Sequence, residues 1–125
     1  MKRLAWIFFV ALALAVAGCG GTTVSTQLGT ISGGFEISAA NLAFDPSELV
    51  VPADVAVDLV FENRESAPHN VAIYADASAG QALFVGEVFS GPGSRLYRLP
   101  ALDAGTYFFR CDVHQEMTGT LVAER

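Results

Sequence analysis

Apolar and polar residues alternate along most of the chain from residue 35 onward, in short runs separated by turn residues. The clearest run places Val55, Val57, Leu59 and Phe61 on one face and a mixed set of residues between them. A period of two is typical of a β-strand with one buried face. No apolar stripe with the 3.6-residue period of a helix accompanies it, so the pattern predicts an all-β protein.

Two of the predicted strands each carry a chemically reactive residue on their inward-facing positions. One begins at His69 and continues through Val71, and the other shares its inward face between Phe109 and Cys111. The outward-facing neighbours of Cys111, which are Arg110 and Asp112, are expected to be solvated.

Further short strands are expected at residues 35–39, 48–51, 83–88, 95–99 and 118–122. Residues 63–66 should leave their strand as a polar loop, and residues 75–80 should form a loop or a single helical turn. About eight strands in about ninety residues are typical of a two-sheet Greek-key β-sandwich.

The first eighteen residues differ in character from everything that follows. A basic start at Lys2 and Arg3 precedes an apolar run over residues 4–17, which is too short to span a bilayer comfortably. The run ends in Val16-Ala17-Gly18-Cys19, which resembles the bacterial lipobox, where the cysteine is lipidated and becomes the mature N-terminus. We therefore predict a lipoprotein signal peptide at 1–18. An ordinary cleaved signal and a retained membrane anchor are the alternatives.

Residues 19–34 connect this signal to the domain predicted for residues 35–125. They are small, polar and nearly free of charge, which predicts a flexible tether reaching roughly 20 Å. A short strand through Val24, Leu28 and Ile31, paired with the edge of the domain, is the alternative. A lipid on Cys19 would hold the domain at the outer face of the bacterial cell membrane or in the periplasm.

The charge of the processed chain narrows its choice of partners. Loss of Lys2 and Arg3 leaves five basic and thirteen acidic side chains, so the net charge is -8. Such a surface argues against binding to nucleic acid or anionic lipid and favours a basic docking face on a protein partner.

The residues with the strongest metal-binding capacity are few and closely grouped. Beyond residue 18 there are two histidines, two cysteines and one methionine, and four of these five are His69, Cys111, His114 and Met117. A thiolate, two imidazoles and a thioether suit copper, because soft sulfur holds Cu(I) and imidazole serves both oxidation states. Cys19 has a separate role, so no disulfide is expected.

Several other interpretations compete with a copper site. Each residue alone fits an ordinary role: His69 as a core histidine, Cys111 as an inert thiol, His114 as a surface residue and Met117 as core filling. All four together do not. Zinc also accepts cysteine and histidine, but thioether is a poor zinc ligand. Two histidines cannot build an additional copper centre, so oxidase or nitrite-reducing chemistry is disfavoured and the protein is not expected to be an enzyme.

Three segments resemble the small blue copper proteins, the cupredoxins, and most closely their plastocyanin and amicyanin branch. The segments are Pro68-His69-Asn70-Val71, Gly105-Thr106-Tyr107-Phe108-Phe109 and Cys111-x-x-His114-x-x-Met117. The resemblance covers residues 35–125. One departure is the pair Gln115 and Glu116, which places polarity where many members of the family have apolar residues.

The resemblance implies one type 1 copper ion near one end of the sandwich. His69, Cys111 and His114 would be its equatorial ligands and Met117 a long axial contact. Asn70 would donate its backbone N–H to the cysteine sulfur and tie the two ligand loops together with its side chain, and Pro68 would be a further residue that surrounds the ligands without binding the ion.

The function implied is that of a monomeric one-electron carrier between redox proteins, with His114 as the solvent edge of the site. Copper delivery or detoxification is the alternative, although it usually requires more methionines. A rigid site predicts donor atoms about 3.5 to 4 Å apart even without metal, with His69 more buried than His114.

Overall fold

The computed structural model describes residues 34–125, which fold into strands and loops only. The predicted signal peptide, Cys19 and all of the predicted tether except Gly34 lie outside the described residues. Within the described part no helix is long and apolar enough to cross a membrane. The strands are β1 (Phe35–Ala40), β2 (Ala43–Asp45), β3 (Glu48–Pro52), β4 (Val57–Asn63), β5 (Pro68–His69), β6 (Ala72–Tyr74), β7 (Ala82–Val85), β8 (Phe89–Ser90), β9 (Gly93–Leu99), β10 (Gly105–Arg110) and β11 (Thr118–Glu124).

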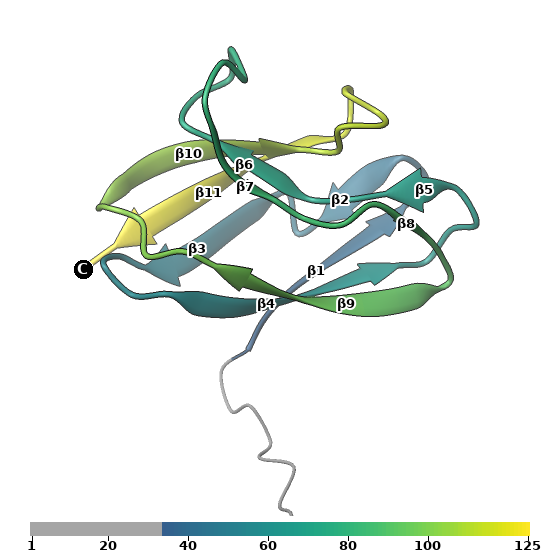
Figure 1. The fold of residues 1–125 in the computed structure, drawn as a ribbon, viewed down its shortest axis with the longest axis horizontal. Helices are drawn as coiled ribbons and strands as arrows, with labels where there is room; N and C mark the ends of the chain where they lie inside the picture. Colours follow the sequence, from purple (N-terminus) through teal and green to yellow (C-terminus); the bar gives the residue numbers. More distant parts are fainter. Residues whose placement is uncertain (1–33) are drawn as a thin grey trace, which may run out of the picture. The chain divides into compact units, whose positions relative to one another are not determined.

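The strands form two main sheets that pack face to face (Figure 1). One sheet has the order β2-β1-β4-β9 and the other the order β3-β11-β10-β6-β7, while β5 and β8 form a separate small pair. Two neighbouring pairs are parallel, β1 with β4 and β3 with β11, and the remaining pairs are antiparallel. The predicted all-β two-sheet sandwich is confirmed. It has more strands than expected because β2, β5 and β8 are only two or three residues long.

Strand β4 shows how far the alternating pattern holds. Val57, Leu59 and Phe61 are buried in turn, as predicted, and the partly exposed residues lie between them. The prediction for Val55 is wrong: it is 53% exposed because it lies in the bend before β4 begins. The predicted start of the polar loop at residue 63 is also wrong, since Asn63 continues the inward-facing series and is completely buried.

The segment between β6 and β7 is a loop. A single turn within it is closed by the N–H of Ala79, which donates to the carbonyl of Asp76 at 3.1 Å. Of the two alternatives for residues 75–80, the loop is therefore the one found.

A cluster of aromatic rings fills the core and reaches toward β5. The ring of Phe61 contacts Phe89 edge-on at 5.6 Å between centroids and stacks on Tyr97 at 5.8 Å. Phe89 in turn pairs with His69 across the β5–β8 ladder. Edge-on and stacked contacts fix ring orientation, so His69 is carried on a densely packed layer.

Candidate metal centre

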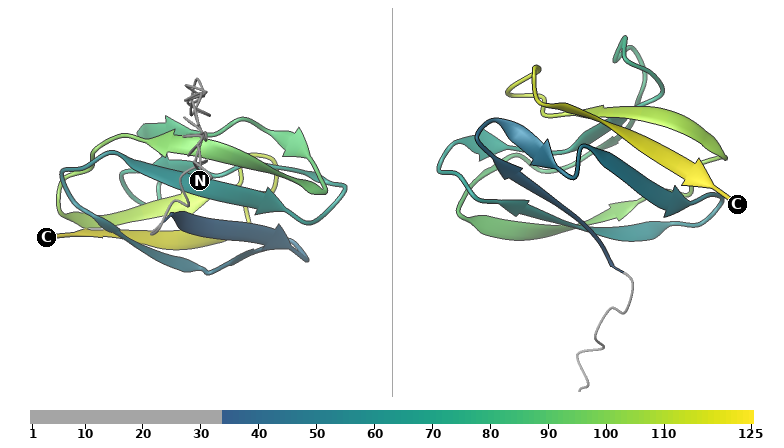
Figure 2. Two further views of the ribbon diagram at one scale, coloured as in Figure 1. Left: turned by 90° about the horizontal axis from the view of Figure 1, so that it is seen from below. Right: turned by 180° about the vertical axis from the view of Figure 1, so that it is seen from behind.

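The four predicted ligands come from two segments that meet at one end of the sandwich. His69 ends β5, Cys111 directly follows β10, and His114 and Met117 lie in the loop between β10 and β11. This loop lies at the opposite end of the molecule from the C-terminus, as both views of Figure 2 and Figure 1 show. The predicted location near one end is thus the observed one.

Two backbone hydrogen bonds close the loop tightly. The N–H of Cys111 donates to the carbonyl of Met117 at 3.0 Å, and the N–H of Met117 donates to the carbonyl of His114 at 2.9 Å. The N–H of His114 points back at the Cys111 sulfur, with a separation of 3.4 Å. The spacing of three residues between successive donors therefore gives a sharp turn that brings their side chains together.

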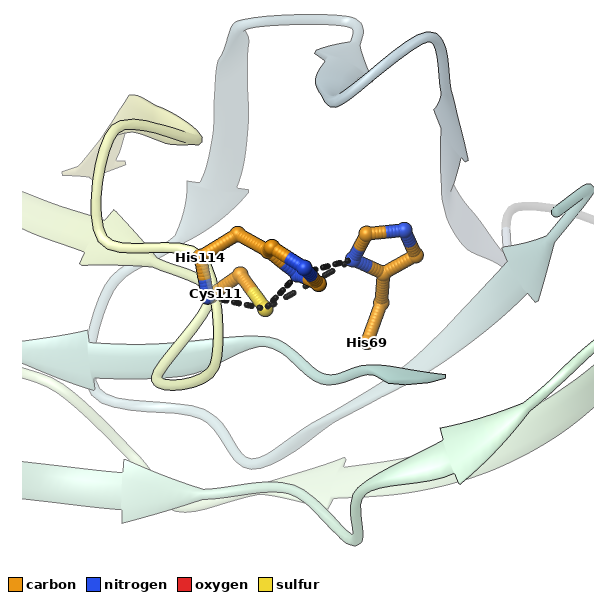
Figure 3. A group of neighbouring side chains, drawn as sticks. All are labelled: His69, Cys111 and His114. Carbon is orange, nitrogen blue, oxygen red and sulfur yellow. Dashed lines mark hydrogen bonds between the residues drawn. The ribbon is translucent and has the colours of Figure 1, made fainter. Parts of the chain in front are cut away.

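Three donor atoms converge at this turn (Figure 3). The Cys111 Sγ lies 3.7 Å from the Nδ1 of His69 and 3.9 Å from the Nδ1 of His114, and the two Nδ1 atoms are 3.2 Å apart. The two distances to sulfur agree with the predicted spacing. The nitrogen pair is closer, as suits atoms whose bonds to a metal are shorter, about 2.0 to 2.1 Å against about 2.3 Å for sulfur.

His69 is more buried than His114, as predicted. His69 and Cys111 are completely buried, whereas His114 is half-buried at the surface. Met117 is 2% exposed and belongs to the same core cluster as Cys111. Its backbone bonds to both Cys111 and His114 place it at the closure of the loop.

The protonation of His69 follows from its hydrogen bond. Its Nε2 lies 2.9 Å from the Oε2 of Glu65, and an ionised carboxylate can only accept, so Nε2 carries the proton. In a neutral ring the Nδ1 is then a bare lone pair, and it faces the Cys111 sulfur and the His114 Nδ1. A metal cation would satisfy all three atoms at once.

Glu65 is held as the acceptor. Burial raises the pKa of its carboxyl, but hydrogen bonds from the backbone N–H of Leu42, the His69 ring and the backbone N–H of Asn41 together lower that pKa below its ordinary value. The side chain is therefore a carboxylate at neutral pH.

Asn70 ties the two ligand segments together, as the resemblance implies. Its Oδ1 accepts from the N–H of Asp112 at 2.8 Å, and its Nδ2 donates to the carbonyl of Gly86 at 3.0 Å and to the Asp112 carboxylate at 3.3 Å. Within residues 34–125 the backbone N–H that reaches the Cys111 sulfur is that of His114 rather than that of Asn70. Pro68 lies exposed in β5, paired with Ser90.

Sequence reasoning missed the network on the other side of Cys111. The Tyr74 hydroxyl donates to the Asp112 carboxylate at 2.5 Å, and this bond raises the pKa of Tyr74. The Arg110 guanidinium lies over the Tyr74 ring at 4.9 Å and contacts Asp112 at 3.4 Å. Arg110 and Asp112 are thus partly buried and paired, not solvated as predicted. The alternation along the strand predicts that both side chains point away from the core, but it does not predict their contacts with Tyr74.

The donor set fits copper better than the alternatives. One buried cysteine sulfur and two imidazoles with a buried methionine beside them combine the soft and borderline ligands that copper accepts in both oxidation states. Zinc sites of the structural kind favour four ligands from cysteine and histidine, and only three such residues converge here.

The sandwich and its donor set define the class of the small copper proteins, and the family match agrees. Residues 4–123 match the family described as the cupredoxin-like domain, so the chain belongs to the cupredoxins. Amicyanin of Paracoccus denitrificans is 32% identical over 92 residues, which are 74% of this chain and 66% of that protein.

Solved structures show the same fold. Auracyanin A of Chloroflexus aurantiacus, described as a "blue" copper protein, has a TM-score of 0.62 and 24% identity over 71% of this chain and 96% of its own. A variant of amicyanin in its reduced Cu(I) form at pH 4 has a TM-score of 0.57 and 26% identity over 74% of this chain and 83% of its own.

Proposed function

We propose that this cupredoxin is a type 1 copper protein that carries one electron between redox proteins outside the cytoplasm. The observation that carries the proposal is the convergence of Cys111, His69 and His114 around one point, with all three donor pairs within 4.8 Å. The amicyanin variant with Cu(I) and the "blue" auracyanin are similar in fold and support copper as the ion.

We assign the ligand roles as the sequence predicts. His69, Cys111 and His114 would hold the ion, and Met117 would supply the weak fourth contact. Among residues 34–125 the group formed by His69, Cys111 and His114 is the one placed to hold a metal.

The chain's contribution to electron transfer is rigidity. Bound copper supplies the reversible Cu(I)/Cu(II) couple. His69 is fixed by Glu65 and the aromatic layer, the loop is fixed by its backbone hydrogen bonds, and Asn70 joins the two. A site that hardly moves keeps the reorganisation between the two oxidation states small. Half-buried His114 offers the edge through which a partner can exchange the electron.

The test is to load the exported protein with Cu(II), record its visible spectrum and cycle it chemically between oxidation states. We expect an intense thiolate-to-copper absorption band that disappears on reduction and returns on oxidation with the copper retained. Loss of copper to a chelator at each reduction would instead indicate a delivery protein. A colourless Cu(II) complex would contradict the proposal altogether.

We further propose that a lipid on Cys19 anchors the protein outside the cell membrane or in the periplasm. Cys19→Ser is expected to abolish incorporation of labelled fatty acid and to leave the precursor unprocessed, because the modified atom is the cysteine sulfur. The measurement is metabolic labelling followed by electrophoresis, with Cys111→Ser as the matched control that keeps its label. Label retained in Cys19→Ser would show that the lipobox interpretation is wrong.

The partner is proposed to present a basic face, because the processed chain is strongly acidic. Electron transfer with such a partner should slow as salt rises, since steering is screened over about 8 to 10 Å at physiological ionic strength. Stopped-flow measurement of the second-order rate against NaCl concentration checks this. A rate independent of salt would point to an apolar docking face instead.

A further inference from the structure

The buried ligand His69 is attached to a carboxylate rather than to a backbone carbonyl. Its Nε2–H donates to the Oε2 of Glu65 at 2.9 Å, and the ring itself is completely buried. Glu65 is partly exposed, with 26% of its side chain accessible, so its carboxylate joins the buried ring to the surface of the molecule.

The carboxylate is in turn held by the turn between β1 and β2. The N–H of Asn41 donates to its Oε1 at 2.9 Å and the N–H of Leu42 donates to its Oε2 at 3.3 Å. Both turn residues have positive φ, 54° and 55°. That conformation is easy for Asn but strained for Leu, whose side chain is also exposed. The strained turn directs two successive N–H groups at one anion, an arrangement that binds negative charge.

A third contact fixes the backbone of Glu65 itself. Its N–H donates to the Oδ1 of Asn63 at 2.9 Å, and Asn63 is completely buried at the end of β4. The carboxylate therefore reaches His69 from a backbone anchored in one sheet, while its oxygens are held by a turn of the same sheet. Nothing in this arrangement requires a metal to be present.

From this geometry we propose that Glu65 is a positioning residue for copper, acting through His69. The inference rests on the proposed function. The carboxylate holds His69 as the Nε2–H tautomer, which presents the Nδ1 lone pair to the ion, and it makes the imidazole a stronger donor. A stronger donor favours Cu(II) over Cu(I), so Glu65 lowers the reduction potential.

The test replaces Glu65 by Gln, which keeps the size of the side chain and removes its charge. We expect the affinity for Cu(II) to fall 10- to 100-fold, as for other partners of metal-bound histidines, while the blue band remains. Cu(I) binding should suffer less. If the affinity for Cu(II) falls tenfold more than the affinity for Cu(I), the reduction potential rises by about 59 mV.

Glu62→Gln is the matched control. Glu62 lies three residues earlier, loses the same charge, and pairs with Arg64 at the surface rather than with a ligand. Its affinity and potential should stay at the wild-type values. A shift in Glu62→Gln equal to that in Glu65→Gln would mean that general charge, and not the contact with His69, sets the potential, and would overturn the inference.

A second measurement needs neither a variant nor copper. Imidazole ¹⁵N–¹H spectra of the metal-free wild-type protein should show His69 as a single Nε2–H tautomer. An Nδ1–H tautomer would overturn the inference, as would a Glu65→Gln protein with unchanged affinity and potential. Either outcome would contradict the role of Glu65 while the wild-type protein still shows the blue band, so the proposed function would stand. A wild-type protein that binds Cu(II) without the band contradicts the proposed function, and the inference fails with it.

Discussion

Replacing Cys111 by Ser is expected to remove the intense visible band of the oxidised, copper-loaded protein completely. The band requires a copper–thiolate bond, and Cys111 is the only cysteine within residues 34–125. Serine keeps the size and the hydrogen-bonding capacity of the side chain, so the sandwich should fold as before. Absorption spectra of the two proteins at equal copper content provide the measurement. An unchanged spectrum would contradict the assignment of Cys111.

Met117→Leu is the matched control for this change. It removes the thioether from the same loop but leaves the thiolate and both imidazoles in place. We expect this variant to keep its band and to have a higher reduction potential, because a weak donor has been lost. Loss of the band in both variants would show that the loop had been disrupted rather than one bond removed.

Replacing Asn63 by Ala should lower the free energy of unfolding by about 2 to 3 kcal/mol, since a buried group left without a partner costs roughly 1 to 3 kcal/mol. The Nδ2 of Asn63 donates to the carbonyls of Ala67 and Phe89 at 2.8 and 3.0 Å, and its Oδ1 accepts from Glu65. Alanine leaves these three groups without their partner, and the contact with the Phe89 carbonyl is fully buried while the other two are partly buried.

Urea unfolding of the metal-free protein measures the effect. Gln81→Ala is the control, because Gln81 is an exposed amide and its loss should change stability by no more than about 0.5 kcal/mol. A similar small effect in Asn63→Ala would mean that water or a shifted backbone replaces the three contacts.

Much of the fold and the principal donors could be predicted because their signals are local. The period of two along Val57, Leu59 and Phe61 depends only on adjacent residues, and it is found as predicted. The ligand segment from Cys111 to Met117 is likewise contained in seven residues of sequence. His69 could be predicted as a further ligand because the chain has just one other histidine, His114.

The remaining features depend on contacts between distant segments. Val55 continues the alternation in sequence, but the chain bends before β4 and leaves it exposed. Strands β5 and β8 are held by pairing with each other, so neither has a run long enough to recognise. In sequence Glu65 resembles any other acidic loop residue, and only the turn at Asn41, 24 residues earlier, shows that backbone N–H groups hold its carboxylate.

The parallel pairing of β3 with β11 has a consequence for the order in which the molecule forms. A tight turn cannot join parallel neighbours, and β3 pairs with β11 across the sequence of the seven strands between them. Pairings of this kind make folding slow, on the scale of milliseconds to seconds for small β-proteins. The His69 ring and the Cys111 sulfur are 42 residues apart in sequence, so their contact also depends on pairing between distant segments. The unfolded chain offers an ion only isolated donors, so copper should bind the native state more tightly and stabilise it by that difference in affinity.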